Sequence, residues 1–440
     1  MTEIPSYVKT VLETLEAAGH QAWCVGGCVR DRLLGRTPPD WDVTTDALPE
    51  ETLALFSAIP TGLQHGTVTV RTDRHRVEVT TYRVDGAYLD HRRPDTVTFT
   101  ASLAEDLQRR DFTVNAMACN LKGELVDLFG GREDLAAGIL RCVGEPDQRF
   151  GEDALRMLRC LRFAAVLGFA IDSATAESIH RNCRALTAIA PERIQAEWGK
   201  LLMGADAAAV LREYPDVIGV FWPEILPMVG FDQKNHHHCF DVWEHTLHAL
   251  AATPADLVLR YAVLLHDVGK PNSFTMDSRG CGHFYHHPKE SGRLAEEMLR
   301  RLKLDNTTRK TVVRLVEWHD RDIPRTDRGL RRALLALGEE DLRRLLAVKW
   351  ADNKGQARFF WATQKEIDKA EDILNRLLAE AACFSLKQLA VRGDDLTQLG
   401  LTGRAVGQTL ERLLRQVVDG ELPNERTALL EYAQREVLSK

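Results

Sequence analysis

Two carboxylates, Asp40 and Asp42, follow a glycine pair, Gly26 and Gly27, and an arginine, Arg30. If residues 40–44 form a strand, the two carboxylates share one face and can hold a hard divalent cation together. Glycine lets backbone N–H groups approach an anion closely, and a guanidinium on the following helical turn adds a forked cationic donor. This stretch therefore predicts a metal–nucleotide site.

Each part of that stretch also has a purely structural interpretation. A Gly-Gly pair before a helix is commonly a turn, and an Asp-x-Asp sequence is commonly a solvated loop or a helix cap. The order of glycine turn, basic helix and Asp-x-Asp strand is what favours the site. Glu78, on a later strand, is a candidate third carboxylate, and an exposed strand glutamate is the alternative.

A second group of polar residues combines Arg110, Asp111 and Asn115 in the segment Arg-Arg-Asp-Phe-Thr-Val-Asn. A forked donor, an acceptor and an amide together suit recognition of a ribose, whose 2′-OH both donates and accepts a hydrogen bond. The alternative is an exposed helix start that Asp111 caps together with Thr113.

The segment that begins at Glu152 predicts a helix with an apolar side and with Asp153 and Arg156 on neighbouring turns. An acceptor beside a forked donor complements the base edge of cytosine or adenine, which offers an amino group next to a ring nitrogen. Guanine and uracil would lose these contacts, at roughly 1–3 kcal/mol each in a buried pocket. A surface ion pair is the alternative. Arg159 and Arg162, on the same helix, are further candidates for nucleotide binding.

Most of the 15 histidines lie in the second half of the chain, within about 85 residues. An apolar run there ends in His266-Asp267-Val-Gly-Lys-Pro and resembles the signature of the HD phosphohydrolase superfamily. Imidazole beside a carboxylate gives mixed nitrogen and oxygen ligation, which suits a divalent metal that activates water against a phosphate ester. The resemblance implies one ligand set of His245, His266, Asp267 and Asp352, and a second metal position with His287 and His319.

The other histidines of this region can be interpreted either as metal ligands or as ordinary side chains. Residues 236–238 and His283 are equally consistent with solvated or capping side chains and with ligands, whereas His248 continues its helix. HD relatives carry Gly-His-Glu where this chain reads His286-His287-Pro288, so the acidic residue beside that ligand is missing.

Hydrophobic periodicity predicts the elements that must position these residues. Val8, Val11, Leu12 and Leu15 recur at helical spacing, and strict alternation after Gly66 predicts a hairpin within a mixed sheet. The predicted elements are helices over 5–20 and 48–58, strands over 67–71 and 77–82, helices over 150–169 and 259–266, a helix starting at 192, and long helices beyond 355 interrupted at 392–393 and 400–403.

Length and composition set the broad class of protein. A chain of 440 residues suggests two to four domains, and its 44% hydrophobic and 28% charged residues are typical of a globular protein. Without an apolar run near the roughly 20 residues of a membrane span, and without a signal peptide, a cytoplasmic protein is expected.

The nine cysteines include no Cys-x-x-Cys pair, so Cys24 and Cys28 are expected to be buried thiols. A net charge of −7 restricts any nucleic-acid interface to a local basic groove.

From Gly26 to Glu197 the sequence closely resembles class II tRNA nucleotidyltransferases, the group of CCA-adding enzymes and bacterial poly(A) polymerases within the DNA polymerase β superfamily. The motifs that carry the resemblance are Gly-Gly-x-Val-Arg-Asp with Asp-x-Asp at 26–42, Arg-Arg-Asp-Phe-Thr-x-Asn at 109–115, Gly-Gly-x-x-Asp at 130–134, Glu-Asp-x-x-Arg at 152–156 and Glu-Arg-Ile-x-x-Glu at 192–197. The resemblance implies an α+β catalytic head with a mixed sheet (1–140), an all-α neck that recognises the nucleobase (141–230), an HD-type helical domain (231–355) and a helical tail that contacts tRNA (356–440).

The same resemblance implies that the chain adds CCA to the 3′ ends of tRNA from CTP and ATP. Mg²⁺ would be held by Asp40 and Asp42, while residues 26–30 hold the triphosphate. The segment 109–115 would recognise the ribose, 153–156 the base, and 192–197 would brace a helix. Residues 86–94 correspond to a loop that members of the family need for adding the terminal A. No membrane and no obligatory protein partner are expected.

Three alternatives remain at the level of sequence. The first is a specialist that adds only A or only CC. The second is a poly(A) polymerase, although such enzymes carry an Arg-Phe segment where this chain has residues 61–67. The third is an HD phosphohydrolase whose nucleotidyltransferase-like half only binds RNA. The substrate and the metal of the HD domain stay open.

Overall fold

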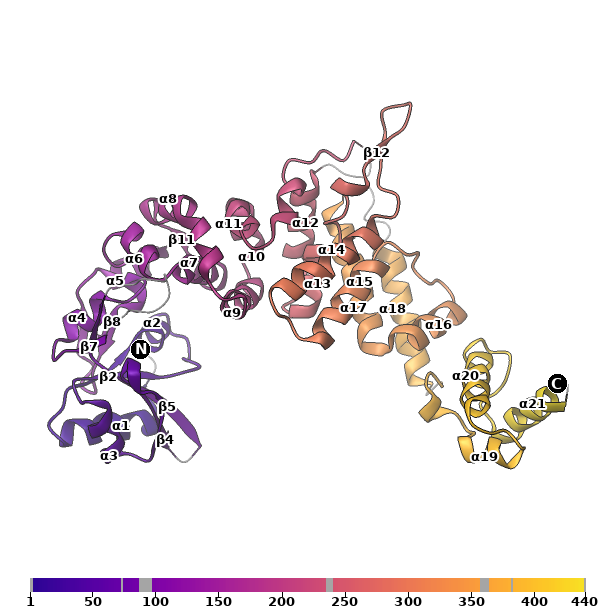
Figure 1. Ribbon diagram of the computed structural model, residues 1–440, viewed down its shortest axis with the longest axis horizontal. Helices are drawn as coiled ribbons and strands as arrows, with labels where there is room; N and C mark the ends of the chain where they lie inside the picture. Colours follow the sequence, from indigo (N-terminus) through magenta and orange to yellow (C-terminus); the bar gives the residue numbers. More distant parts are fainter. Residues whose placement is uncertain are drawn as a thin grey trace. The chain divides into compact units, whose positions relative to one another are not determined.

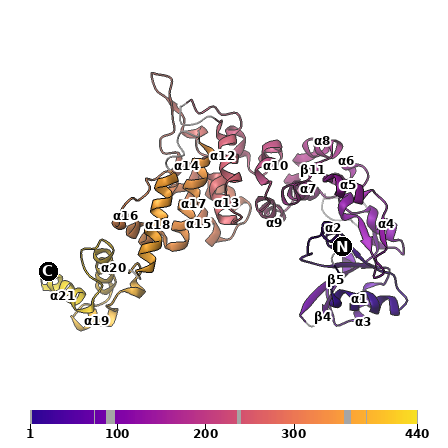
Figure 2. The same cartoon turned by 180° about the vertical axis from the view of Figure 1, so that it is seen from behind.

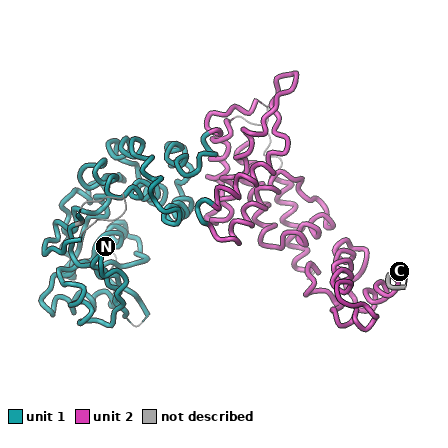
Figure 3. Tube along the Cα trace, viewed as in Figure 1, with its two compact units in different colours: residues 1–226, 301–303 teal, residues 227–300, 304–440 magenta. Residues whose placement is uncertain are grey.

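The computed structural model describes residues 3–72, 74–86, 97–234, 240–356, 364–380 and 383–438. It divides into two compact units: residues 1–226 with 301–303, and residues 227–300 with 304–440 (Figure 3). The predicted loop for A addition, beyond Gly86, and the histidines at 236–238 lie outside the described residues. Among the described helices, none has the length and apolar character needed to cross a bilayer.

The first unit contains a seven-stranded mixed sheet (Figure 1). Its strands are β1 (Ala22–Val25), β2 (Asp42–Thr45), β3 (Ala58–Gly62), β4 (Thr67–Thr72), β5 (His75–Thr81), β8 (Met117–Cys119) and β9 (Leu125–Asp127). They lie in the order β3-β4-β5-β2-β1-β8-β9. The β2–β5 pair is parallel, and the other neighbouring pairs are antiparallel. The predicted mixed sheet and its β4–β5 hairpin are confirmed.

Helices and a short ribbon complete this first part of the chain. They are α1 (Ser6–Ala17), α2 (Gly27–Leu33), α3 (Pro49–Leu55), α4 (Leu103–Gln108), α5 (Gly131–Ala137) and the antiparallel pair β6 (Arg83–Asp85) and β7 (Val97–Phe99). The four apolar residues that predicted α1 are fully buried: Val8, Val11, Leu12 and Leu15. Cys24 and Cys28 are buried thiols, as expected.

Two predicted boundaries are wrong for identifiable reasons. Strand β2 begins at Asp42 rather than at Asp40, because its partner β1 already ends at Val25 and residues 38–39 are prolines without N–H groups for pairing. The helix predicted over 48–58 ends at Leu55, and the next residues form β3. This strand tolerates Pro60 because it lies at the edge of the sheet.

The rest of the first unit is helical apart from one short parallel pair. Its elements are β10 (Ile139–Leu140), β11 (Ala170–Ile171), α6 (Pro146–Glu152), α7 (Leu155–Leu167), α8 (Ser173–Asn182), α9 (Pro191–Leu202), α10 (Ala207–Glu213) and α11 (Pro215–Gly219). The helix predicted over 150–169 is confirmed only over Leu155–Leu167, as α7, because residues 150–152 belong to α6 and the extended backbone of Asp153 separates the two helices. The predicted core residues Leu155, Leu158, Leu161 and Phe163 are buried. Helix α7 packs against α9.

The second unit begins with a layered group of helices (Figures 1 and 2). Its elements are α12 (Val242–Ala251), α13 (Leu257–Leu265), the hairpin β12 (Thr275–Met276) and β13 (Gly282–His283), α14 (His287–Arg301), α15 (Asn306–Trp318), α16 (Asp327–Leu337), α17 (Glu339–Gly355) and α18 (Gln364–Ala379). Helices α12, α13, α15 and α17 contact one another. This group carries every predicted HD ligand on a helix or next to a helix end.

The last helices of the second unit share a separate apolar core. They are α19 (Gly393–Gln398), α20 (Arg404–Val418) and α21 (Arg426–Leu438). The core includes Leu396, Leu413 and Leu429, all fully buried. Helix α19 begins at Gly393 and α20 directly after Gly403, so both predicted helix breaks are confirmed. Altogether, the predicted order of an α+β region followed by helices is confirmed.

Candidate functional site

The turn from β1 into α2 carries the predicted glycine pair. Gly26 has a φ of +78°, in the left-handed region that glycine adopts without strain. A Cβ at this position would lie 3.1 Å from Nη1 of Arg110, so the absent side chain also leaves room for that guanidinium. Gly27 begins α2, and Arg30 is buried in the same helix. The fold therefore brings the turn together with arginines from two separate motifs.

Two of the acidic residues lie on neighbouring parallel strands. Asp42 on β2 is in register with Glu78 on β5, so both side chains leave the same face of the sheet. Burial, opposed by the charge of Arg110 and assisted by the charges of Glu78 and Asp40, raises the pKa of Asp42 to about 6. Bound cations relieve such repulsion, and a donor set of carboxylate oxygens fits Mg²⁺.

Asp111 is the centre of a buried hydrogen-bond network. Its Oδ2 accepts from Nε and Nη2 of Arg159 at 2.9 and 2.6 Å, and its Oδ1 accepts from Nδ2 of Asn115 at 3.2 Å. Although burial opposes ionisation, Arg159 holds the pKa of Asp111 at about 2. Oδ1 of Asn115 in turn accepts from Nη1 of Arg30 at 2.7 Å, so the network reaches the glycine turn.

The alternative interpretation of this segment, an exposed helix start, is wrong. Residues 113–115 form a single 3₁₀ turn, and all three are buried. The backbone N–H of Thr113 donates to the carbonyl of Arg141, whereas Asp111 accepts from the backbone N–H of Phe112 and from Arg159. These contacts fix the orientation of the Asp111 carboxylate.

Asp153 and Arg156 occupy the junction of α6 and α7, and each is held by a partner. Oδ2 of Asp153 accepts from Nη2 of Arg193 at 2.8 Å. Nη1 of Arg156 donates to Oε2 of Glu152 at 2.6 Å, and its Nη2 donates to the backbone carbonyl of Arg109 at 3.0 Å. Asp153 lies just before α7 rather than inside it. Both side chains are therefore oriented before any base is present.

The remaining arginines of α7 connect to α9 and to an aromatic ring. Nε of Arg162 donates to Oε2 of Glu197 at 2.5 Å, and Arg159 lies 3.8 Å from the same carboxylate. The guanidinium groups of Arg162 and Arg30 lie 3.8 and 5.0 Å from the ring centroid of Phe163. Sequence reasoning assigned Phe163 only to the core, although an aromatic residue directly after an arginine-rich turn is a signal for cation–π contact.

The second site is a buried cluster of histidines and aspartates in the second unit. Nε2 of His245, on α12, lies 2.9 Å from Oδ1 of Asp352, on α17, and 3.3 Å from Nε2 of His266, at the end of α13. Oδ2 of Asp267 lies 3.4 Å from His245 and 3.2 Å from His266. The first predicted ligand set is thus brought together, with one donor atom of each residue facing a common point.

The second predicted ligand set shares Asp267 with the first. Oδ1 of Asp267 lies 3.4 Å from Nε2 of His287 and 3.7 Å from Nε2 of His319, which are 3.3 Å from each other. The two oxygens of this carboxylate therefore face two separate groups of imidazoles. His286 is exposed, whereas His287 is buried, so the departure from Gly-His-Glu leaves the histidine ligand in place.

Backbone carbonyls fix the histidine tautomers at this cluster. Nδ1 of His266, His287 and His319 lies 2.6–2.9 Å from the carbonyl oxygens of Val263, Phe284 and Val316. A carbonyl only accepts, so each Nδ1 is the donor of that bond and each Nε2 faces the centre. These donors fit one or two divalent transition-metal ions.

The charge of Asp267 is set by its neighbours. Burial opposes ionisation of Asp267, but His266 and Lys270 hold its pKa well below the usual range. Nζ of Lys270 lies 2.7 Å from Oδ2 of Asp267 and donates to Gln233 at 2.9 Å. Glycine at 355 keeps α17 close, since a Cβ there would meet the backbone oxygen of His245 at 2.7 Å.

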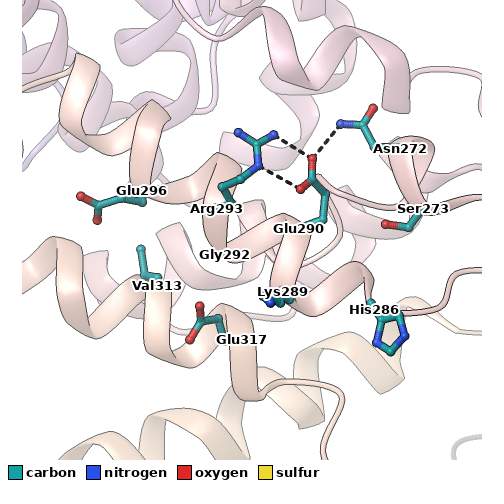
Figure 4. Close-up of a pocket in the computed structure, with 10 residues that line it drawn as sticks. All are labelled: Asn272, Ser273, His286, Lys289, Glu290, Gly292, Arg293, Glu296, Val313 and Glu317. Carbon is teal, nitrogen blue, oxygen red and sulfur yellow. Dashed lines mark hydrogen bonds and ion pairs between the residues drawn. The ribbon is translucent and has the colours of Figure 1, made fainter.

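A cavity of about 420 Å³ opens onto this cluster. Asp267, His287, His319 and Asp352 line its floor, and Cys281 and His283 of the β12–β13 hairpin line its wall. A larger pocket between α14 and α15 is separate: Figure 4 shows Arg293 paired there with Glu290. None of the predicted ligands lines that pocket, whereas four of them line the smaller cavity.

Comparison with known proteins relates both halves of the chain to one class, the nucleotidyltransferases that act on RNA ends. Residues 22–141 match the poly(A) polymerase head domain, residues 168–214 an RNA- and SrmB-binding site of polymerase A, and residues 284–433 the second domain of tRNA nucleotidyltransferases. The mixed sheet with Asp42 and Glu78 lies in the first of these regions.

The family follows from relatives that match the full length of the chain. A CCA-adding enzyme of Lactiplantibacillus plantarum is 35% identical across 100% of this chain and 99% of its own length. One of Lactobacillus helveticus is 49% identical over 47% of this chain and 52% of its own length. The solved structure of the Bacillus stearothermophilus CCA-adding enzyme with CTP is 31% identical, with a TM-score of 0.75, covering 98% of this chain and 97% of that one. The chain belongs to the CCA-adding enzyme family.

Proposed function

We propose that this chain completes the 3′ end of tRNA by adding C, C and A from CTP and ATP, with the enzyme itself selecting each nucleotide. The observation that carries the proposal is the full-length identity of 35% to a CCA-adding enzyme. A relative of 31% identity was solved with CTP, which supports the nucleotide half of the proposal. We further propose that the protein works in the cytoplasm without an obligatory protein partner.

In this proposal Asp40 and Asp42 hold Mg²⁺, with Glu78 as a neighbouring carboxylate. Bound Mg²⁺ supplies charge neutralisation at the α-phosphate and at the attacking oxygen. The 3′-hydroxyl of tRNA attacks the α-phosphate of CTP or ATP, and pyrophosphate leaves. Gly26, Gly27 and Arg30 hold the triphosphate, which the close approach of backbone at the left-handed Gly26 favours.

Nucleotide selection is assigned to the two polar groups beside this centre. Arg110, Asp111 and Asn115 orient the ribose. Arg159 holds Asp111 in place, and Arg162, which donates to Glu197 on α9, is a further cation beside the nucleotide. Asp153 and Arg156 present an acceptor and a donor to the base. Both side chains can still bind a substrate while they contact their protein partners. Asp153, for example, accepts one hydrogen bond from Arg193 and keeps further lone pairs.

We also propose a functional division that is finer than the two compact units. Residues 1–140 form the nucleotidyltransferase head, and residues 141–230 the helical neck that recognises the nucleobase. Residues 231–355 form the HD domain, and residues 356–440 the helical tail that contacts tRNA. The apolar core that α19–α21 share supports a helical tail, although α18 packs against α16 and α17 of the preceding group.

A second activity, metal-dependent phosphohydrolysis, is proposed for the histidine–aspartate cluster. Its support is the convergence of six predicted ligands, His245, His266, Asp267, Asp352, His287 and His319. A divalent ion bound there supplies Lewis-acid activation of water and phosphate ester. The chain's own contribution is to orient each Nε2 and to keep Asp267 ionised. RNA ends that carry a 2′,3′-cyclic phosphate are the proposed substrate class, because their repair serves the same tRNA end.

The first test is incubation of the purified protein with tRNA that lacks CCA. CTP alone should add two residues, ATP alone none, and both together should add all three. Products limited to CC, limited to A on a CC-ended tRNA, or extended as poly(A) would each support a different alternative. An Asp40→Ala, Asp42→Ala double variant should lose all extension, whereas retained extension would refute the assignment.

The second test separates the two activities. We expect His266→Ala to keep tRNA extension and to lose hydrolysis of a 2′,3′-cyclic phosphate with added divalent metal. The Asp40→Ala, Asp42→Ala variant should show the opposite pattern. If the wild type and His266→Ala are equally inactive toward the cyclic phosphate, the proposed substrate is wrong. Loss of tRNA extension in His266→Ala would favour a single shared site instead.

A further inference from the structure

The β12–β13 hairpin brings together three metal-ligating side chains that belong to neither site described above. They are Asp277, Cys281 and His283, and one donor atom of each lies within 4.8 Å of the other two. The cluster combines a carboxylate, a thiol and an imidazole rather than repeating one type of charge. Its donor set therefore differs from the nitrogen and oxygen set of the HD cluster.

The hairpin turn holds the first of these ligands in place. The N–H of Gly280 donates to the carbonyl of Asp277 at 3.0 Å, and Gly280 has a φ of +76°, as three-residue hairpin loops require. Oδ1 of Asp277 accepts from the backbone N–H groups of Arg279 and Cys281, both at 2.9 Å. Those bonds leave Oδ2 directed at the third ligand, so the local sequence Asp-Ser-Arg-Gly-Cys preorganises the carboxylate.

The second strand of the hairpin is anchored from outside. The N–H of Gly282 donates to the carbonyl of Lys234 at 2.8 Å. A Cβ at Gly282 would lie 2.3 Å from the carbonyl oxygen of Gln233, so only glycine permits this approach. The ring of His283 also stacks on Tyr285, with centroids 5.4 Å apart. Cys281 and His283 therefore flank a fixed point of the backbone.

The distances in the cluster suit a small tetrahedral ion. Nε2 of His283 lies 3.1 Å from Oδ2 of Asp277. Bonds of about 2.0–2.3 Å to a tetrahedral Zn²⁺ place neighbouring donors roughly 3.3–3.8 Å apart. An ion therefore needs only a small outward shift of the His283 and Asp277 side chains, while a donor atom of Cys281 lies within 4.8 Å of both. A thiolate ligand favours Zn²⁺ and related transition metals over Mg²⁺ or Ca²⁺.

We propose that Asp277, Cys281 and His283 bind a transition-metal ion of the Zn²⁺ class, at a site distinct from the HD centre. Three protein ligands leave the fourth position for water or for an anion. Cys281 and His283 also line the cavity above the HD cluster, so two of the three ligands border the space that a phosphate ester would enter under the proposed phosphohydrolysis.

The test uses Co²⁺ as a spectroscopic probe on the full-length, metal-free protein. A thiolate bound to Co²⁺ gives a near-ultraviolet charge-transfer band, whereas a centre of histidine and aspartate ligands gives none. We expect the band to appear as Co²⁺ is titrated until all the metal sites of the protein are filled, and to disappear when Zn²⁺ is added. Cys281→Ser should abolish it, and His283→Ala should weaken Zn²⁺ binding by more than about 100-fold, since even outer-shell losses cost about 10–100-fold.

Matched variants make the outcome decisive. His286→Ala removes an exposed histidine of the same loop and should keep the band. A His266→Ala, Asp267→Ala double variant should also keep it while binding fewer Co²⁺ ions. Absence of the band in folded wild-type protein overturns the proposal. A band that survives Cys281→Ser overturns it as well, because another cysteine would then be the ligand.

Discussion

Replacing Asp42 by Asn should stabilise the metal-free protein while abolishing nucleotidyl transfer. Burial, together with the charges of Glu78 and Asp40, raises the pKa of Asp42 from 3.8 to about 6. A shift of roughly two pH units corresponds to about 3 kcal/mol by which the ionised carboxylate destabilises the folded state. Asn keeps the shape of the side chain and carries no charge, so the variant avoids this cost.

The pH dependence follows from the sign of that shift. A raised pKa means that folded protein binds the proton more tightly than unfolded protein. Wild type should therefore gain stability as pH falls from about 7 to about 4, whereas Asp42→Asn should not. The advantage of the variant should be full above about pH 7 and should vanish below about pH 3, where the carboxyl is protonated in both states.

Scanning calorimetry of the full chain in a chelating buffer measures this difference. For a unit of this size, 1 kcal/mol shifts Tm by about 2–4 °C, so the transition of the first unit should rise by several degrees at pH 8. Mg²⁺ should then stabilise wild type and leave Asp42→Asn unchanged. Glu13→Gln, an exposed carboxylate on α1, is the control and should have no effect. A variant less stable than wild type at pH 8, or equally shifted at pH 4 and 8, refutes the reasoning.

Three further substitutions separate the sites. Gly355→Ala places a Cβ 2.7 Å from the backbone oxygen of His245 and should lower phosphohydrolysis by about 10–100-fold, with tRNA extension unchanged in the same preparation. Arg159→Met leaves Asp111 buried without its forked partner and should cost roughly 2 kcal/mol in urea unfolding at pH 7, a value reduced for the partial exposure of the arginine. Gly26→Ala forces a φ of +78° on alanine and should lower single-turnover CTP addition by about 10–100-fold, with KM for tRNA unaffected. Unchanged rates in either glycine variant, or unchanged stability in the arginine variant, would contradict these assignments.

The local sequence was sufficient to predict an element wherever a short run of residues carries both its hydrophobic pattern and the residues that end it. The first helix follows from four apolar positions, and the β4–β5 hairpin follows from alternation around a charged turn. The apolar run before His266 likewise fixes helix α13 and the place where it ends. In these segments one short stretch of sequence determines both the element and the residue at its end.

Hydrogen bonds between residues far apart in the sequence could not be predicted from local pattern. The bond from Arg193 to Asp153 joins the starts of two helices 40 positions apart, and Arg159 reaches Asp111 across 48 positions. Such pairs depend on how α7 packs on α9 and on the head, which periodicity does not encode. The sharing of Asp267 between two ligand groups is similar, since sequence motifs name the ligands but carry no information on which oxygen faces which imidazole.

The parallel register of β2 and β5 has a consequence for how this enzyme can vary. Glu78 lies beside Asp42 because the parallel register of β2 and β5 pairs these two positions, and the register depends on the number of residues that precede each of them in its strand. Inserting one residue in β5 ahead of Glu78 would turn its carboxylate to the opposite face, even if every hydrogen bond of the sheet re-formed. Loops of the head can change in length without that penalty. Under the proposed Mg²⁺ site, the number of residues along this strand is therefore constrained independently of which side chains it carries.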